Sequence, residues 1–283
     1  MSAAFHEPTT IAEAVAILAT EPDVCCLAGG QSLVAALNTR SFAAPTLVSL
    51  QRIEELRGLR RGADGSVTVG AMTTHRDVAR ADCFQAGQEI VPQAAAHIAH
   101  PAVRTMGTIG GSICHADPAA DYPGVLAACG ATVTLVNARG QRELAASDFF
   151  VDFLTTAVEP DEMVTAITFP PMPEGTRGIY EKFCRSEGDF ATVSVALILG
   201  MHDGRCAFAR VALGGCGPTP VRAPEAETRL IGSRLDDDDI SSASNLLCSR
   251  AAPQSDVRGS AEYRLMLVPR LLVRALDRAR RRP

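Results

Sequence analysis

Apolar residues recur at helical spacing near the start of the chain, at Ile11, Val15 and Leu18. Thr10 and Glu13 have the spacing of a capping box, so the pattern predicts a helix that begins at this threonine. A strand, a turn with two glycines, a short helix and a second strand follow, in an order typical of a small α/β layer. The pattern places these strands and this helix at residues 24–28, 33–38 and 46–50.

Beyond residue 50 the pattern changes to hairpins and short helices, until the proline-rich segment 170–175 interrupts it. This segment is the best linker in the chain, so we place a domain boundary near residue 175. The elements predicted before the linker are hairpins formed by 56–61 with 66–71 and by 132–136 with 142–144, helices at 74–81, 89–98 and 122–129, and a strand at 163–169. Those predicted after the linker are strands at 180–184, 193–199 and 206–213 and helices at 223–231, 239–250 and 260–281.

The composition excludes several classes of protein. The chain has 283 residues, 47% of them hydrophobic and 21% charged, with a formal net charge of −5, which suits two domains. Its basic residues form no block apart from a short arginine tail, so a nucleic-acid surface is not expected. The longest apolar run, 191–200, is too short for a membrane span, and the polar N-terminus does not resemble a signal peptide. We therefore expect a cytoplasmic chain.

Nine cysteines are present, and none forms a C-x-x-C pair or the spacing of an iron–sulfur ferredoxin. An odd number of cysteines in such a chain is typical of free, mostly buried thiols. We therefore expect no iron–sulfur cluster and no metal site in this chain. The six histidines are scattered, with only His97 and His100 at a weakly ligand-like spacing, and no nucleophile–histidine–acid grouping is found, so no catalytic residue is assigned.

Lysine is nearly absent from the chain. Among the 27 basic residues Lys182 is the only lysine, and the others are all arginines. A bias of this strength is typical of a genome with GC-rich codons. A lysine that persists against it is a candidate site residue, and an ordinary surface lysine is the alternative.

Two segments, residues 28–33 and 108–113, combine a glycine pair with a following hydroxyl residue. Glycines allow a sharp turn and a close backbone approach to a ligand, and free amides at such turns bind phosphate groups. Two loops of this kind could clamp one diphosphate, and Asp121, at the start of a predicted helix, could bind a ligand hydroxyl. Tight turns without a ligand are the alternative. The G-x-G-x-x-G fingerprint of a nicotinamide-binding domain is absent.

These motifs carry a resemblance to a known family. Residues 28–33 (AGGQSL) and 108–113 (TIGGSI) resemble the two flavin-binding signatures of the medium subunit of molybdenum hydroxylases, the family of carbon monoxide, xanthine and N-heterocycle dehydrogenases. Residues 182–191 (KFCRSEGDFA) resemble its third signature, K-x-x-R-x-x-G-D-aromatic-A. Residues 212–223 and 258–264 resemble motifs of the family's C-terminal domain. The resemblance therefore covers nearly the whole chain, with the motifs in the expected order.

The resemblance implies an α+β fold with two domains. Residues 1–175 would form an FAD-binding domain of the vanillyl-alcohol-oxidase (PCMH) type, with subdomains at about 1–55 and 56–175. Residues 176–283 would form the smaller α+β C-terminal domain of a carbon monoxide dehydrogenase flavoprotein. The implied partners are a small subunit with two [2Fe–2S] clusters and a large subunit with the molybdenum cofactor, in a dimer of heterotrimers.

The implied cofactor of this chain is FAD. The glycine loops would cradle its pyrophosphate through backbone amides, Asp121 would contact the ribityl or phosphate region, and Ile98 and Val164 would line the adenosine end or the ring. Lys182 would lie at the isoalloxazine edge, where an ammonium stabilises the reduced, negatively charged flavin, and Phe190 would lie close to the ring. The full set of expected cofactor-binding residues is Ala28, Gly29, Gly30, Gln31, Ser32, Leu33, Ile98, Thr108, Gly110, Gly111, Ser112, Asp121, Val164, Lys182 and Phe190.

The expected function is that of an oxidoreductase subunit that transfers electrons. Substrate would be hydroxylated at molybdenum in another subunit, and the FAD would pass electrons from the iron–sulfur clusters to an external acceptor. A stand-alone flavin oxidase or reductase and a flavin-free scaffold are the alternatives. Substrate and acceptor stay open, as does the effect of Gln31 and Ser112, which replace the family's commoner histidine and asparagine. Replacing Lys182 with alanine is expected to leave the fold intact and to change flavin affinity or potential.

Overall fold

Three short parallel strands form the first sheet of the computed structural model, which describes residues 4–21, 23–41 and 46–281. The order is β1-β3-β2. The strands and the two helices beside them are β1 (Ala4–His6), α1 (Ile11–Thr20), β2 (Val24–Leu27), α2 (Leu33–Asn38) and β3 (Thr46–Ser49). The predicted helices and strands here are confirmed, whereas β1 was not predicted because three residues carry too little alternation to be recognised.

The predicted capping box at α1 is only half formed. Thr10 accepts a hydrogen bond from the amide of Glu13 at 3.1 Å, as expected of an N-cap. The carboxylate of Glu13, however, accepts from the amide of Thr9 at 2.7 Å instead of from Thr10. The helix therefore has both stabilising contacts, with the second shifted by one residue.

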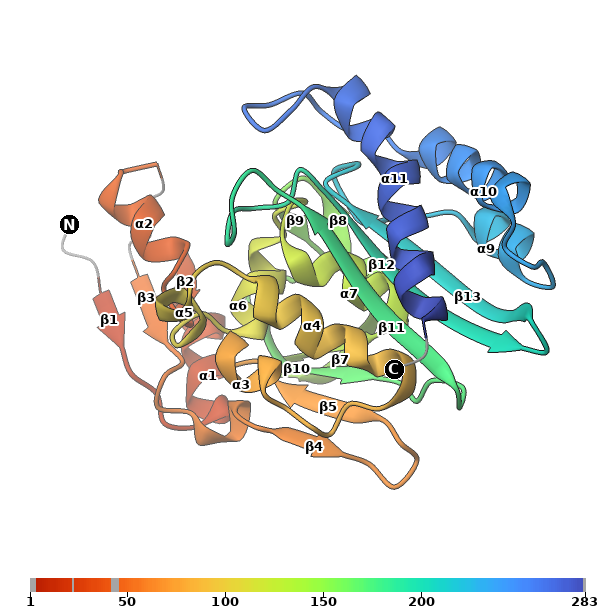
Figure 1. Ribbon diagram of the computed structural model, residues 1–283. Helices are drawn as coiled ribbons and strands as arrows, with labels where there is room; N and C mark the ends of the chain where they lie inside the picture. The colour runs from red at the N-terminus through yellow and green to blue at the C-terminus, as the bar shows by residue number, and fades with distance from the viewer. Residues whose placement is uncertain (1–3, 22, 42–45, 282–283) are drawn as a thin grey trace.

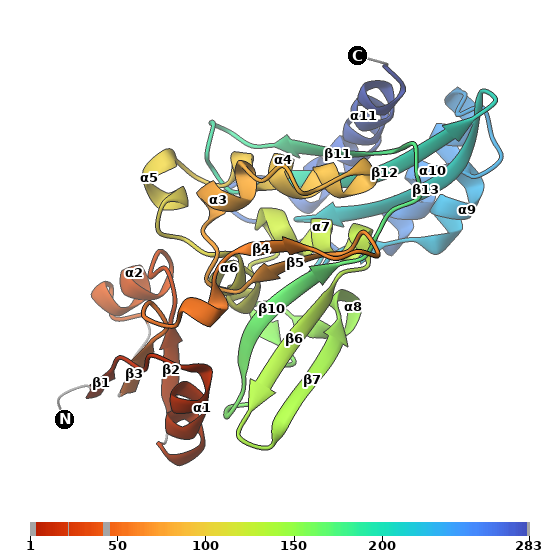
Figure 2. The same ribbon diagram turned by 90° about the horizontal axis from the view of Figure 1, so that it is seen from below.

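The second sheet has five antiparallel strands in the order β4-β5-β10-β6-β7, seen in the lower half of Figure 2. Both predicted hairpins and the strand at 163–169 are confirmed. The strands are β4 (Leu59–Arg61), β5 (Val67–Gly70), β6 (Thr132–Asn137), β7 (Gly140–Ala145) and β10 (Met163–Phe169). The first hairpin begins later than predicted because Leu56 lies in a 3₁₀ turn, η1 (Glu54–Leu56), with its side chain fully buried.

The third sheet has the order β11-β12-β13-β14 and follows the linker. Its strands are β11 (Thr176–Phe183), β12 (Val193–His202), β13 (Arg205–Gly214) and β14 (Val221–Arg222). Three helices cover one face, α9 (Pro224–Leu230), α10 (Asp237–Arg250) and α11 (Ala261–Arg280), and α4 (Ile90–His97) and α7 (Asp121–Cys129) pack on the other. Each strand and helix predicted in this half is present, although β11 begins four residues earlier than predicted and the two-residue β14 was not predicted.

Strand β12 is buried on both faces. Val195 and Leu197 belong to the core under α9, α10 and α11, while Ala196 and Ile198 belong to the core shared with α4 and α7. A strand covered on both faces has a continuous apolar sequence, which explains the long apolar run that the sequence showed here. The third sheet thus binds the N-terminal helices to the C-terminal ones.

Helix α7 is the central element of the fold. All nine of its residues are buried, and it lies between the second and third sheets. Its first residue is Asp121, so the chain places a carboxylate deep inside the molecule, where the ends of α4 and β11 also meet.

The remaining elements are short. They are α3 (His75–Ala79), η2 (Ala86–Glu89), α5 (Pro101–Arg104), α6 (Ile109–His115), α8 (Ala146–Phe149), β8 (Phe150–Asp152) and β9 (Thr155–Thr156). The helix predicted at 74–81 is confirmed as α3, but α5, α6 and α8 were not predicted. Among the described residues, no helix is both long and apolar enough to cross a membrane.

Candidate functional site

The first glycine loop joins β2 to α2. Gly30 has a φ of +72°, in the left-handed region that favours glycine. A Cβ on Gly29 would lie 2.1 Å from the carbonyl oxygen of Met106, so this glycine is required by the chain's own packing. Among the described residues, no backbone carbonyl or side chain accepts a hydrogen bond from the amides of residues 29–33. This loop therefore offers a row of amide donors to a ligand.

The second glycine loop contains the first turn of α6, and the amides of residues 109–112 are used within the chain. The amide of Ile109 donates to Thr73 O at 3.1 Å and that of Gly110 to Ala71 O at 2.9 Å. Those of Gly111 and Ser112 donate to the N-cap Thr108, to its side-chain and main-chain oxygens respectively. Four amides of this loop are therefore satisfied by a capped helix turn docked on Ala71, whereas no described group accepts a hydrogen bond from the amide of Thr108. That this loop helps to hold a pyrophosphate stays a prediction.

The two loops lie side by side, as the diphosphate hypothesis expects. A Cβ on Gly111 would lie 3.4 Å from the Cβ of Ala28, and Gly29 packs on Met106 just before Thr108. A clamp formed by these two loops would nevertheless be asymmetric. Amide donors come from the first loop, while the second loop is left with the close surface at Gly111 and the half-buried side chain of Ser112.

The capping threonine can be tested separately from any ligand. Thr108→Ala removes the acceptor of the Gly111 amide and should lower the free energy of unfolding by about 1 kcal/mol, or about 2–4 °C in Tm for a chain of this size. Thermal unfolding measures it. Thr105→Ala is the matched control, since that threonine is exposed and its hydroxyl only donates to Ala102 O. Equal losses in the two variants would contradict the capping role.

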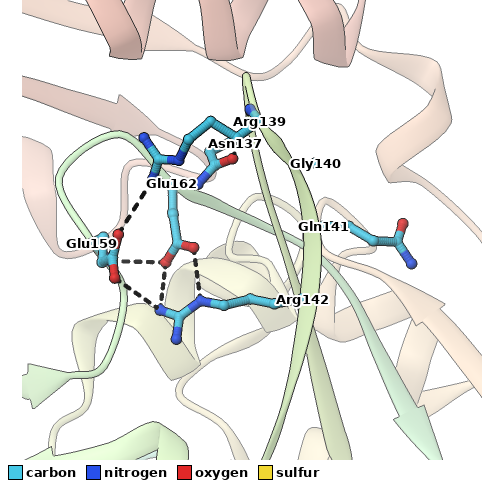
Figure 3. Close-up of a pocket in the computed structure, with 7 residues that line it drawn as sticks. All are labelled: Asn137, Arg139, Gly140, Gln141, Arg142, Glu159 and Glu162. Atoms are coloured by element: carbon cyan, nitrogen blue, oxygen red, sulfur yellow. Dashed lines mark hydrogen bonds and ion pairs between the residues drawn. The ribbon is translucent and has the colours of Figure 1, made fainter.

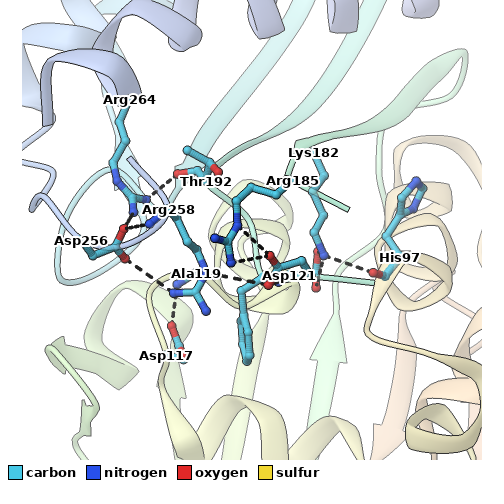
Figure 4. Close-up of polar contacts among 12 residues, drawn as sticks. His97, Asp117, Ala119, Asp121, Lys182, Arg185, Thr192, Asp256, Arg258 and Arg264 are labelled. Atoms are coloured by element: carbon cyan, nitrogen blue, oxygen red, sulfur yellow. Dashed lines mark hydrogen bonds and ion pairs between the residues drawn. The ribbon is translucent and has the colours of Figure 1, made fainter. Parts of the chain in front are cut away.

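Lys182 and Asp121 form a buried ion pair (Figure 4). The ammonium lies 3.0 Å from Oδ1 and 3.2 Å from Oδ2 of Asp121, and it donates to the carbonyl oxygen of His97 at 3.1 Å. The two side chains are only 3% and 5% exposed. Because an ammonium has three N–H donors, one is left for a further partner.

The other residues expected near the cofactor differ in how exposed their side chains are. Ile98 directly follows His97 at the end of α4 and is half-buried. The loop that carries Phe190 lies beside Asp121, because the amide of Ala191 donates to Ala119 O at 3.2 Å. Phe190 is 39% exposed, with a guanidinium carbon 5.2 Å above its ring. Val164 packs in the core of β10 at 5% exposure, so its side chain offers a ligand almost no surface.

The ring of Phe190 is held by the C-terminal half of the chain. The guanidinium above the ring belongs to Arg258, in the loop before α11. The same guanidinium lies 3.5 Å from the carboxylate of Asp256. Asp256 in turn pairs with the buried Arg264 at 2.5 Å, and Arg264 donates to Thr192 O (Figure 4). These contacts therefore tie the loops at 185–191 and 254–259 to each other and to the start of α11.

Two buried tyrosines near the pair were missed by sequence reasoning. Tyr180 donates to Asp121 at 2.6 Å, and Tyr122 lies 3.3 Å from Nδ1 of His75. Burial, and to a smaller extent the charge of Arg104, lower the pKa of His75 to about 4, so the ring is neutral at pH 7. A signal for Tyr180 was present: it precedes Lys182 by two residues, which places both side chains on one face of a strand.

A separate pocket, at the β6–β7 hairpin, is lined mainly by arginine and glutamate side chains (Figure 3). Arg142 makes two hydrogen bonds to Glu162, at 2.8 and 2.7 Å, and these bonds lower the pKa of that carboxyl. Glu159 lies 3.5 Å from Arg139. Since both carboxylates are already neutralised by arginines, this cluster ties the hairpin to the start of β10, and we assign it no ligand.

Comparison with known proteins agrees with the motifs. Residues 1–172 match a family described as the FAD binding domain in molybdopterin dehydrogenase. Residues 178–279 match the CO dehydrogenase flavoprotein C-terminal domain.

Full-length relatives show the same relationship. The carbon monoxide dehydrogenase medium chain of Afipia carboxidovorans is 39% identical over 98% of this chain and 96% of its own length. The 6-hydroxypseudooxynicotine dehydrogenase complex subunit alpha of Paenarthrobacter nicotinovorans is 36% identical over 91% of this chain and 88% of its own length.

Solved structures extend the similarity to the fold. A crystal structure of the Cu,Mo-CO dehydrogenase superposes with a TM-score of 0.94 at 38% identity, covering 99% of this chain and 98% of that one. Quinoline 2-oxidoreductase from Pseudomonas putida 86 gives 0.93 at 33% identity, covering 99% and 97%. The resemblance read from the motifs is thereby confirmed, and the chain belongs to the family of FAD-binding medium subunits of molybdenum hydroxylases.

Proposed function

We propose that this chain binds FAD and is the electron-transfer flavoprotein subunit of a multi-subunit molybdenum hydroxylase, an oxidoreductase. The observation that carries the proposal is the pair of adjoining glycine loops, one with unused amides, in a chain whose family match runs from residue 1 to 172 as an FAD-binding domain. Bound FAD would supply the redox chemistry, taking up electrons that partner subunits deliver and passing them to an external acceptor.

The residues present fit such a cofactor. The amides of the first loop suit the anionic pyrophosphate, which needs several N–H donors in a row. Lys182 has one N–H donor beyond those that Asp121 and His97 take, and this donor suits a carbonyl oxygen or ring nitrogen. Ile98 and Phe190 add partly exposed apolar surface beside the pair. We propose that these groups, with the remainder of the residues expected from the motifs, hold the FAD.

We extend the proposal to the assembly. Relatives include a carbon monoxide dehydrogenase medium chain and a xanthine dehydrogenase FAD-binding subunit, each named as one part of a larger enzyme. This supports a small subunit with [2Fe–2S] clusters and a large subunit with the molybdenum cofactor as partners, in a dimer of heterotrimers. All nine cysteines are free thiols, which supports a reducing compartment, the cytoplasm. The first matched segment ends within the proline-rich linker, at residue 172, and the second begins just after it, at residue 178. This supports domains at 1–175, with subdomains at about 1–55 and 56–175, and 176–283.

Absorbance and turnover of the purified chain test the function. The folded chain should carry or take up FAD, seen as a visible flavin band and identified after heat release. It should reduce an acceptor with an organic substrate only when both partner subunits are added. A folded chain that takes up no flavin would favour a scaffold, and substrate turnover by the chain alone would favour a stand-alone oxidase.

A further inference from the structure

The hydroxyl of Tyr180 is directed at the carboxylate of Asp121. The O–H donates to Oδ1 at 2.6 Å, the short distance typical of a charge-assisted bond. The tyrosine side chain is 1% exposed, so water does not compete for either group. This residue lies outside the three family signatures and makes no ion pair of its own.

The carboxylate lies between the hydroxyl and an ammonium. Tyr180 and Lys182 are two residues apart on β11, on the face that meets the first turn of α7. Asp121 Oδ1 accepts the tyrosine hydrogen bond and also lies 3.0 Å from the ammonium. The ring of His97, which packs 5.8 Å from the ring of Tyr180, closes the cluster on the side of α4.

Asp121, Lys182 and Tyr180 act in opposite directions on the electrostatic potential at any group nearby. The negative charge of Asp121 opposes the effect that the ammonium of Lys182 has on any group nearby. The positive end of the Tyr180 O–H dipole points at this carboxylate and offsets part of its negative potential. All three side chains are at most 5% exposed, so these interactions are poorly screened and act over several ångströms.

We propose that Tyr180 is a positioning residue of the flavin site: by sharing the carboxylate of Asp121 with Lys182, its hydroxyl sets how much positive potential reaches the flavin. This inference rests on the proposed function and deepens it. Burial, together with the neighbouring charge of Asp121, raises the pKa of Tyr180 well above its ordinary value. The hydroxyl therefore keeps its proton and remains a donor throughout the physiological range.

Redox titration of the full chain loaded with FAD tests the inference. Tyr180→Phe keeps the ring against His97 and removes only the O–H, so the FAD midpoint potential should move to a more negative value. Tyr122→Phe is the matched control. It removes another fully buried tyrosine hydroxyl, next in sequence to Asp121, but one whose partner is His75, and the potential should stay at the wild-type value.

A second comparison tests the route through Asp121. In a chain that already carries Asp121→Asn, adding Tyr180→Phe should produce a much smaller shift than in the wild-type chain. A shift that persists there, equal shifts in the two tyrosine variants, or no shift in Tyr180→Phe would each overturn the inference. These outcomes differ from failure of the proposed function, in which the wild-type chain itself would take up no FAD.

Discussion

Replacing Lys182 with methionine should lower the free energy of unfolding of the chain by about 3–5 kcal/mol. The ammonium is 3% exposed and the carboxylate of Asp121 is 5% exposed, so the substitution leaves a buried negative charge with Tyr180 as its main remaining partner. Methionine nearly fills the volume of the lysine stem, which keeps the loss of packing small. Urea denaturation of the flavin-free chain measures the effect without reference to FAD.

The double variant Lys182→Met, Asp121→Asn is the control. It removes both charges at once, and most of the lost stability should return, because an amide accepts the Tyr180 hydrogen bond without a charge to bury. If Lys182→Met were as stable as the wild-type chain, the pair would not be a buried ion pair. The sequence alone predicts that the fold stays intact without Lys182, and the buried partner adds the expectation that the intact fold is less stable.

Lys182 consequently has two roles in one position. As the single lysine of the chain it is a candidate site residue, and the family resemblance implies that its ammonium lies at the flavin edge. The structure shows that most of its donors are used inside the chain, by Asp121 and by His97 O. An ammonium compensated in this way acts on a ligand through the difference between two opposed charges. Small changes at Asp121 or Tyr180 are therefore expected to matter as much as changes at the lysine.

The fold could be predicted where the sequence pattern is local. Strand β10 (Met163–Phe169) and helix α2 (Leu33–Asn38) have the predicted bounds, because a turn signal lies at each end and the apolar period is uniform between them. Strand β1 (Ala4–His6) and helix α6 (Ile109–His115) were missed. β1 pairs with β3, about forty residues further along the chain, and α6 has two glycines, which have poor helix propensity, in its first turn.

The candidate site could be predicted only where its residues belong to local sequence motifs. Motif spacing singled out both glycine loops, which the structure places side by side, and Lys182, but it did not reveal the partners of each group. Which amides are free depends on long-range contacts, such as the one between Gly110 and Ala71, that no local pattern encodes. The junction of Asp121 with Tyr180 joins residues 59 positions apart. Only the alternation along β11 pointed to that tyrosine.

Gly29→Ala should abolish retention of FAD and lower the free energy of unfolding by about 1–3 kcal/mol. The added Cβ would lie 2.1 Å from Met106 O and 2.7 Å from the Cα of Gly107, both backbone atoms that cannot rotate away. The two loops must therefore separate, and the amides of the first loop move with them. Flavin absorbance after gel filtration measures retention, and denaturation of the same sample measures stability.

Gly111→Ala is the matched comparison, because it adds the same methyl group to the other loop. Its Cβ would lie 3.0 Å from Thr108 Oγ1 and 3.4 Å from Ala28 Cβ, a tight contact with side chains that can shift slightly. Alanine is also preferred over glycine within a helix turn, so stability should stay within about 1 kcal/mol of the wild-type value. Equal losses of stability in the two variants would contradict the packing assigned to Gly29. A stable Gly111→Ala chain without FAD would place the cofactor directly against Gly111, because no change within the protein would then explain the loss.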